Sequence, residues 1–460
     1  TGRGLMESPD LSWDDIELHQ KNPLFAGKTW KWSPQYWSIL ESAQVEIEAL
    51  GQAAFSFYQA IEKLYVKSKN GQKILRNEDL KVPWVADYYD VGKPDWLVEH
   101  SISKPVLGSM PAVLRPDLLP TQDGLALTEW DAVPGGIGLT AFLNQIYFGR
   151  NSSEMINSFG EALMKACPGT KQGESKFAIA VSEEAETYLP EMEWLAESLR
   201  SLGYWIVVCA PSDLQMRDSG VFLENEKIDL LYRFWELFDY EQVPEMKELA
   251  RLVEEEKLVV TPPMRPFQEE KLSLALFHHH RLQEFWQENL NKKELALLRG
   301  VIPKTWVLDP APIPPGATVD GPLVQGKRLG NWSELSGASK KERSLVIKAS
   351  GFHETAWGAR SVVIGDDVSG EEWGQSLSDA VTSFPSPVSV LQKFHKPVLL
   401  EHPVFDHEAE IVPMLGRLRL SPYFFVIGEQ VKWSGSLATF CPADKKIIHG
   451  MKDGALLPAK

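Results

Sequence analysis

The sequence predicts an α/β protein with a doubly wound parallel sheet in its middle and antiparallel strands near its end. In residues 175–263, short apolar runs alternate with amphipathic helical segments, which is typical of a parallel sheet with helical crossovers. In residues 417–440, the pattern alternates as in a meander of antiparallel strands. The 460 residues suffice for two or three domains and a large buried core.

The elements of the first half follow from the spacing of the apolar residues. Residues 34–67 carry apolar and aromatic side chains at helical spacing, so we expect a long packing helix there. The expected strands of the parallel sheet are FAIAV (177–181), YWIVVCA (204–210), IDLLYRF (228–234) and KLVVTPP (257–263), with helices at 190–202 and 246–255.

The second half predicts another group of strands beyond a proline-rich connection. A helical stretch at 272–298 leads towards the run at 310–322, whose prolines predict a loop or a hinge. Further strands are expected at 344–350, 359–365 and 388–394, with the loop GFHETAWG (351–358) between the first two and a helix at 370–383.

Charge and composition exclude several classes of partner. The net charge of −16 argues against a nucleic acid or an anionic membrane, because both attract a basic surface. No apolar run approaches the roughly 18 residues of a spanning helix, and nothing near Thr1 is typical of a signal peptide. Cys167, Cys209 and Cys441 lie far apart, which predicts unpaired thiols in a reducing compartment. We therefore expect a cytoplasmic protein with a small-molecule substrate, of unknown oligomeric state.

A carboxylate cluster is expected on the hairpin formed by VLRPDLL and LALTEWD. Glu129 and Asp131, at positions i and i+2, share one strand face, and Asp117 on the partner strand can join them. Three carboxylates repel one another unless a cation neutralises them, and hard oxygen ligands suit Mg²⁺. Arg115 shares the face of Asp117 and could stabilise a phosphoryl group or an oxyanion. Hairpins that end in acids are common, however, so this pattern alone favours an ordinary charged hairpin.

Two further segments could bind a nucleotide. Lys348 ends one expected strand, and Gly358 and Arg360 lie where the next begins, so this loop could clamp phosphates. The strand VSVLQKF carries Gln392 and Lys393 at its end, where backbone groups could meet an adenine edge. A solvated hairpin tip and an ordinary edge strand explain these residues equally well.

Two other signals are weaker. The run from His278 to His280 has no further metal-ligand spacing nearby, and consecutive residues on a helix point in different directions, so we expect surface residues or a single phosphate contact. The glycines of PGGIGLTAF precede an apparent helix, but their spacing matches neither a Walker nor a Rossmann motif. We therefore expect an ordinary turn and helix start there.

The order of these signals resembles the synthetase domain of glutathionylspermidine synthase and its relatives, the circularly permuted ATP-grasp ligases. In that family an RxD motif, followed at a fixed interval by ExN, supplies an arginine and the Mg²⁺ ligands. Arg115, Asp117, Glu129 and Asp131 match this form, with Asp131 in the place of the asparagine. The resemblance covers most of the chain.

The resemblance implies an ATP-grasp-like, circularly permuted fold with a Rossmann-like subdomain and a mixed or antiparallel subdomain. Five regions follow from it: a helical lead-in (1–110), a metal-binding strand pair with the following helices (111–172), a Rossmann-like subdomain with a connecting helix (173–300), a lid subdomain (301–398) and C-terminal antiparallel strands (399–460).

The resemblance also implies an ATP- and Mg²⁺-dependent ligase that joins an acid to an amine through an acyl phosphate. In this reading Asp117, Glu129 and Asp131 hold Mg²⁺, and Arg115 is the catalytic residue. The implied nucleotide-binding residues are Lys348, Gly358, Arg360, Gln392 and Lys393.

The sequence departs from the family pattern at one lysine. The family places it near the helix after the Rossmann-like segment, and ALFHHHRLQEFW offers none, so His279, His280 or Arg281 is expected to contact phosphate instead. The missing lysine leaves open a catalytically silent homologue that binds a nucleotide or acts as a scaffold. A third hypothesis places the function in residues 175–263, which would make the protein a nucleotide-sugar transferase or another Rossmann-type enzyme.

The substrate carboxylate needs a cationic partner. A guanidinium fork matches a carboxylate, so arginines near the predicted site are candidate clamps. The candidates are Arg233 and Arg265, with Arg417 and Arg419 as further possibilities.

Overall fold

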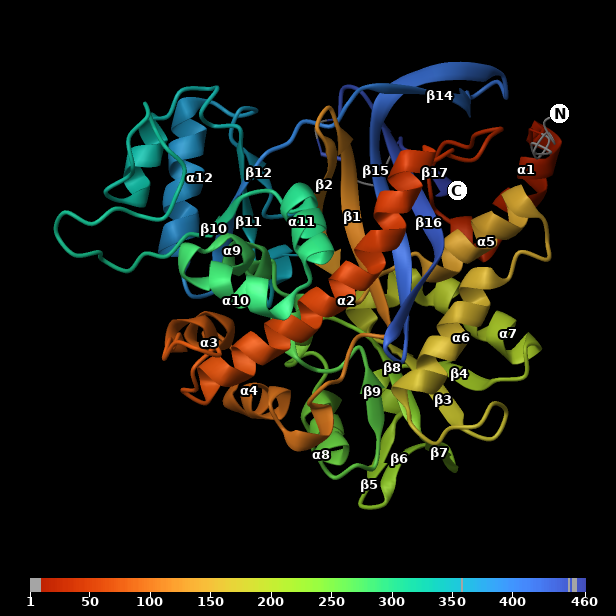
Figure 1. Ribbon diagram of the computed structural model, residues 1–460. Helices are drawn as coiled ribbons and strands as arrows, with labels where there is room; N and C mark the ends of the chain where they lie inside the picture. Colours follow the sequence, from red (N-terminus) through yellow and green to blue (C-terminus); the bar gives the residue numbers. More distant parts are fainter. Residues whose placement is uncertain (1–9, 357–358, 446, 449–452) are drawn as a thin grey trace.

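An antiparallel sheet lies at the centre of the molecule (Figure 1). The computed structural model describes residues 10–356, 359–445, 447–448 and 453–460, and within these residues the sheet has six strands. The strand order is β17-β16-β15-β1-β2, and β14 pairs with β15. The strands are β1 (Val113–Thr121), β2 (Gly124–Asp131), β14 (Leu400–Phe405), β15 (Ile411–Ile427), β16 (Gln430–Pro442) and β17 (Ala455–Ala459). The predicted hairpin is therefore joined to the predicted C-terminal meander, because β1 pairs with β15.

The predicted parallel sheet is confirmed, with the strand order β4-β3-β8-β9. Its strands are β3 (Lys176–Val181), β4 (Trp205–Cys209), β8 (Leu230–Phe234) and β9 (Val259–Thr261). Alternate residues of β3 face opposite sides: Phe177 packs in the cluster with α6 (Glu154–Ala166) and α7 (Leu189–Ser201), whereas Ala178 packs with α8 (Glu245–Glu254). Helices thus cover both faces, as in a doubly wound sheet.

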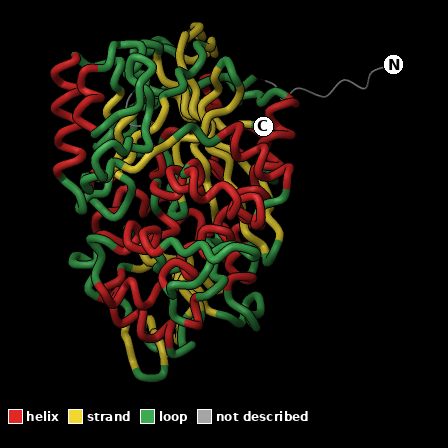
Figure 2. Tube along the Cα trace, turned by 60° about the vertical axis from the view of Figure 1, so that its left-hand side comes forward, coloured by secondary structure: helices red, strands yellow, loops and turns green. Residues whose placement is uncertain are grey.

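A small antiparallel sheet between β4 and β8 was not predicted. Its strands are β5 (Gln215–Arg217), β6 (Gly220–Leu223) and β7 (Glu226–Ile228). The hairpin of β5 and β6 projects at the bottom of the molecule in Figure 1 and Figure 2. Strands of three or four residues are too short to give a readable apolar period.

A third antiparallel sheet has the order β10-β13-β11-β12 and is called here the β10–β13 sheet. Its strands are β10 (Thr305–Val307), β11 (Leu345–Ala349), β12 (Val363–Ile364) and β13 (Ser389–Lys393), and α12 (Gly370–Thr382) packs against one face. Ile347 and Leu391 point to α12, whereas their neighbours Lys348 and Gln392 point to the opposite face. The strand expected at 359–365 is shorter than predicted, because 359–361 form a turn.

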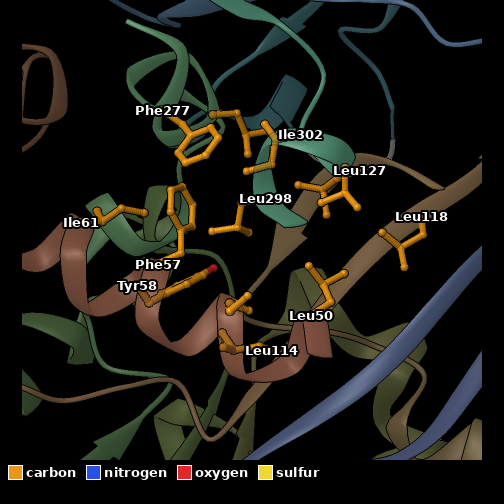
Figure 3. Packing of buried hydrophobic residues seen from close by; sticks show 14 of the residues in the cluster. Leu50, Phe57, Tyr58, Ile61, Leu114, Leu118, Leu127, Phe277, Leu298 and Ile302 are labelled. Atoms are coloured by element: carbon orange, nitrogen blue, oxygen red, sulfur yellow. The ribbon is translucent and has the colours of Figure 1, made fainter. Parts of the chain in front are cut away.

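The long helix α2 (Glu41–Lys69) crosses the central sheet (Figure 1). Figure 3 shows its residue Leu50 near Leu114 and Leu118 of the β1–β2 hairpin and its residue Phe57 beside Phe277 and Leu298. All of these residues belong to one buried cluster, which also contains Leu127. Burying such a side chain contributes roughly 1.5–3 kcal/mol. The apolar side of the hairpin is therefore firmly anchored, which fixes the position of its polar side.

Further helices surround these sheets. They are α1 (Trp13–Gln20), α3 (Pro83–Asp90), α4 (Asp95–Ser101), α5 (Ile137–Phe148), α9 (Leu272–His278), α10 (Gln283–Asn289) and α11 (Lys292–Val301). The stretch predicted as helical at 272–298 is interrupted, because the backbone leaves the helix at His279 and again at Leu290. No helix among the described residues has the length and apolar character needed to cross a bilayer.

Candidate functional site

The polar side of the β1–β2 hairpin carries the predicted acids. Asp117 lies opposite Glu129, and Arg115 lies opposite Asp131. The register shifts after Asp117, so that Leu118 pairs with Leu127 and Thr128 bulges out. This bulge turns Glu129 to the face of Asp117, whereas strict alternation would keep it on the buried face of Leu127. Asp117, Glu129 and Asp131 thus lie on one face of the hairpin, as predicted, and the bulge produces this grouping.

Arg115 lies between two of the acids. Its Nε is 3.1 Å from Asp117 Oδ1, and its Nη2 is 3.0 Å from Asp131 Oδ2. Nη1 donates to the backbone oxygen of Gly135 at 3.1 Å. Burial opposes its charge, but Asp117 and Asp131 outweigh that effect and raise the pKa of Arg115 well above its usual value. Arg115 therefore stays a cation at the base of the site.

Asp117 is the most deeply buried of the acids, with 1% of its side chain exposed. Ser421 on β15 donates a hydrogen bond of 2.8 Å to Asp117 Oδ1. Arg419, also on β15, places Nη1 3.4 Å from Asp117 Oδ2. Asp117 is thus held by two strands, and of the four arginines suggested as clamps, Arg419 lines the cavity described below.

Glu129 has a partner that the sequence analysis missed. Lys271, which precedes the first residue of α9, places Nζ 2.8 Å from Glu129 Oε2. Burial alone would raise the pKa of Glu129, but Lys271, Lys348 and Arg115 outweigh it and lower that pKa to about 2. Glu129 is therefore ionised at neutral pH.

Lys348 reaches the site from the β10–β13 sheet. Its Nζ donates to the backbone oxygen of Thr128 at 2.9 Å and to Gln392 Oε1 at 2.7 Å. Burial is the main cause that lowers the pKa of Lys348 to about 8, and the nearby cation Lys271 adds to it. With a pKa near neutral pH, Lys348 becomes more fully protonated when an anion binds beside it and less so when a cation does.

These residues line one cavity of about 750 Å³, called here the central cavity. It lies between the β1–β2 hairpin, the β10–β13 sheet and the ends of β3 and β8. Of the predicted site residues, it is lined by Arg115, Asp117, Glu129, Asp131, Lys348, Arg360, Gln392 and Lys393. Gly358 lies outside the described residues.

The central cavity also contains acids that the sequence analysis did not select. Glu236 and Asp239, which follow β8, line it together with Glu354 of the 351–358 loop. Burial, with the nearby Glu269 and Asp131, raises the pKa of Glu236 to about 8. The central cavity therefore has cations in one part, supplied by Arg115, Lys271 and Lys348. In another part, around Glu236, a further negative charge is unfavourable.

The predicted phosphate contacts His280 and Arg281 are not brought to this cavity. They lie in the 3-10 turn after α9, where His280 Nδ1 is 3.4 Å from Asp320 Oδ2. Neither is among the described residues that line the central cavity. The structure thus does not bring these two residues to the acid cluster, and the lysine that contacts the cluster from this part of the chain is Lys271, one residue before α9 begins.

Arg233 and Arg265 are also corrected as carboxylate clamps. Both side chains are 0% exposed. Arg233 donates to the backbone oxygens of Pro262, Trp235 and Pro263 and pairs with Glu269. Arg265 pairs with Glu62 and donates to the backbone oxygens of Ser101 and Ser109. Their guanidinium groups are engaged within the protein, and neither residue is among the described residues that line the central cavity.

The glycine turn before α5 is an ordinary helix start, as expected. Glu191 accepts hydrogen bonds from the backbone N–H groups of Gly136 at 2.7 Å and Leu139 at 3.0 Å. A carboxylate of the protein thus takes the place that an anion would occupy at this helix N-terminus. A Cβ on Gly138 would lie 2.4 Å from the backbone oxygen of Glu191, so only glycine fits there.

Comparisons with known proteins give a likeness in structure but not in sequence. No protein-family profile and no curated protein matches this chain. A glutathione synthetase-like effector from Globodera pallida, solved in the apo form, superposes with a TM-score of 0.58 and 11% identity over 97% of this chain and 95% of that chain. A putative gamma-glutamylcysteine synthetase from Methylobacillus flagellatus gives a TM-score of 0.41 and 13% identity over 77% of this chain and 81% of that one, too weak to support an argument. The chain therefore shares the fold of a glutathione synthetase-like protein over nearly its whole length.

Proposed function

We propose that this chain is an ATP-dependent ligase that joins a carboxylic acid to an amine, with the central cavity as its active site. The observation that carries this proposal is the convergence of Asp117, Glu129 and Asp131 with two lysines from other elements, Lys271 and Lys348, in one cavity. Phosphoryl transfer needs positioned cations around the phosphates and acids that hold a divalent ion. The likeness to a glutathione synthetase-like fold supports the same reaction class.

The nucleotide would lie between the hairpin and the β10–β13 sheet. Lys348 and Lys271 would contact its phosphates, since both line the cavity, Lys271 beside Glu129 and Lys348 beside the backbone oxygen of Thr128. Gln392 and Lys393, at the end of β13, would lie beside the adenine. Glu354, Ala356 and Arg360, which line the cavity, would cover the phosphates and exclude water, which an acyl phosphate requires.

The donor set fits Mg²⁺, because carboxylate oxygens are its preferred protein ligands. Asp117, Glu129 and Asp131 would hold it, and it would neutralise charge on the phosphates during transfer. In the structure these acids are paired with Arg115 and Lys271. Those cations would turn to the phosphates when a nucleotide enters, so the acids would be freed for the metal.

The proposed chemistry has two steps. A carboxylate oxygen of the acid attacks the γ-phosphorus, the bond to the β-phosphate oxygen breaks, and ADP leaves with the acyl phosphate formed. The amine nitrogen then attacks the acyl carbon, phosphate leaves, and the nitrogen loses a proton as the amide forms. Arg115 would stabilise charge on the transferring group and on the tetrahedral oxyanion.

A binding module without catalysis is the second candidate. Every acid of the cluster already has a cationic partner within the protein, and Asp131 stands where the resembled family has an asparagine. Such a protein would bind a nucleotide without turnover.

ADP release separates the two candidates. The purified chain would be incubated with ATP, Mg²⁺ and a panel of amino acids and short peptides, with hydroxylamine as the amine, so that an acyl phosphate is trapped as a hydroxamate. A ligase gives ADP and hydroxamate with at least one acid, and Glu129→Gln abolishes both, whereas the exposed control Glu371→Gln does not. Nucleotide binding without ADP release across the panel would favour the binding module.

A further inference from the structure

Two consecutive histidines and a distant aspartate meet beside the C-terminal end of α9. One ring nitrogen each of His279 and His280 and one carboxylate oxygen of Asp320 lie within 4.8 Å of one another. Within the described ranges, this is the grouping of three His, Cys, Asp or Glu side chains that comes close enough to hold one metal ion. It lies apart from the central cavity, whose lining includes none of the three residues.

The break in the helix brings the histidines together. Helix α9 ends at His278, and His279 has extended backbone angles of φ −65° and ψ 128°. The rings of His279 and His280 consequently stack, with centroids 4.7 Å apart and planes 22° apart. His278 still belongs to the helix and turns elsewhere, where its Nε2 lies 2.9 Å from the backbone oxygen of Ile302. Consecutive residues on a helix point in different directions, which would keep neighbouring histidines apart. This holds for His278 but not for His279 and His280, which lie beyond the end of α9.

The three side chains are already oriented by their surroundings. The ring of Trp84 lies 4.5 Å from the ring of His279. Nδ1 of His280 is 3.4 Å from Asp320 Oδ2. The backbone N–H of Arg281 reaches His279 Nδ1 at 3.3 Å, a long hydrogen bond that a metal on the same nitrogen would replace. One donor atom of each residue therefore lies within 4.8 Å of the other two before any ion binds.

We propose that His279, His280 and Asp320 form a binding site for a divalent transition-metal ion such as Zn²⁺. Two imidazoles and a carboxylate are a donor set that suits Zn²⁺, Co²⁺ or Ni²⁺, whereas Mg²⁺ prefers oxygen alone. Tetrahedral coordination with bonds of about 2.0–2.1 Å separates the donor atoms by roughly 3.3 Å. The exposed side chains of His280 and Asp320 reach that spacing by rotation. Water fills the fourth position.

The consequence is a link between two parts of the chain. Asp320 belongs to the proline-rich segment between β10 and β11, and His279 follows α9. Both line a second cavity of about 710 Å³, together with Trp306 and Trp332. A metal bound by all three residues ties residues 308–331, which follow β10 and contain Asp320, to the end of α9 beside this cavity.

Metal titration tests the site directly. The full chain, stripped with a chelator, is titrated with Zn²⁺ in competition with a chromophoric indicator, and with Co²⁺ while the visible absorption of tetrahedral Co²⁺ is recorded. We expect one ion per chain, with affinity at least tenfold weaker in His280→Gln and in Asp320→Asn. The control is His407→Gln, because His407 is also exposed and lies 3.8 Å from a carboxylate, that of Glu408. The proposal is overturned if the wild type does not bind Zn²⁺, or if His280→Gln and Asp320→Asn bind it as tightly as the wild type does.

Proteolysis tests the link. Lys327 and Arg328 are exposed on the 308–331 segment and are cleavage points for trypsin. Zn²⁺ should slow cleavage there severalfold in the wild type and in His407→Gln, but not in Asp320→Asn. Equal cleavage rates with and without Zn²⁺ in the wild type would show that the ion does not tether the segment. Thermal unfolding measured without metal confirms that each variant is folded.

Discussion

Lys271 Nζ lies 2.8 Å from Glu129 Oε2, which joins the start of α9 to the end of β2. This contact brings a cation from outside the hairpin to the acid cluster. Lys271 lies just before the segment 275–286, in which the sequence offers no lysine.

Replacing Lys271 should impair nucleotide binding without unfolding the protein. In Lys271→Met, Glu129 loses its partner and the phosphates lose a cation, so we expect nucleotide affinity to fall by about tenfold or more, equivalent to about 1.4 kcal/mol. Calorimetric titration with an ATP analogue measures the effect. Lys292→Met removes an exposed lysine of α11 as the control. Equal affinity in Lys271→Met and the control would remove Lys271 from the site.

Lys348 should make nucleotide binding depend on pH. Its pKa is lowered to about 8, mainly by burial, so the unliganded protein loses this charge as the pH rises through about 8. Bound phosphates favour the charged form, and the nucleotide Kd should therefore increase above pH 8. In Lys348→Arg the charge persists, so the Kd should stay flat between pH 7 and 9. An equal increase of the Kd above pH 8 in both proteins would assign the pH dependence to a group other than Lys348.

Ionisation of the buried Glu236 should lower the stability of the folded state at high pH. Its folded-state pKa of about 8 lies above the ordinary value of 4.5, because burial and the nearby Glu269 and Asp131 oppose its charge. The folded state thus binds more protons than the unfolded state between these values, and stability falls as the pH rises from 4.5 through 8. Glu236→Gln should have a higher Tm than the wild type at pH 8.5 and an equal one at pH 4. The exposed neighbour Glu241→Gln is the control, and a Tm difference that does not change with pH would contradict the assignment.

Arg233 should matter for folding and not for ligand binding. Arg233→Met leaves Glu269 largely buried without its ion pair, which typically costs about 3–5 kcal/mol. Chemical denaturation should show that loss, and the double variant Arg233→Met/Glu269→Gln should recover part of it. Nucleotide affinity of the folded variant should match the wild type, whereas a selective loss of affinity would restore Arg233 as a ligand contact.

The sequence predicted those features that depend on local patterns. The alternation of strands and helices in 175–263 and the turn between β1 and β2 are local signals, and both elements are present. The bulge at Thr128 is not a local signal, because it arises from pairing with Asp117 and Leu118. Without it, Glu129 would face the apolar cluster.

Features set by tertiary contacts were beyond the sequence. The burial of Arg233 and Arg265 depends on backbone oxygens from distant segments. The neighbouring sequence therefore does not distinguish these two arginines from exposed ones. Lys271 follows two glutamates and looks like a surface residue until α9 is placed against β2. Asp320 is separated from His280 by two helices and a strand, and only the folded chain brings them together.

The central claim is that the acids of the β1–β2 hairpin hold a metal–nucleotide complex. The most direct measurement is calorimetric titration of the chain with a non-hydrolysable ATP analogue, with and without Mg²⁺, beside the isosteric variant Asp117→Asn/Glu129→Gln. The account predicts one binding event per chain that strengthens with Mg²⁺ in the wild type and loses that dependence in the variant. No binding to the wild type, or equal Mg²⁺-dependent binding in both proteins, would contradict it and leave the acids as the charged side of a structural hairpin.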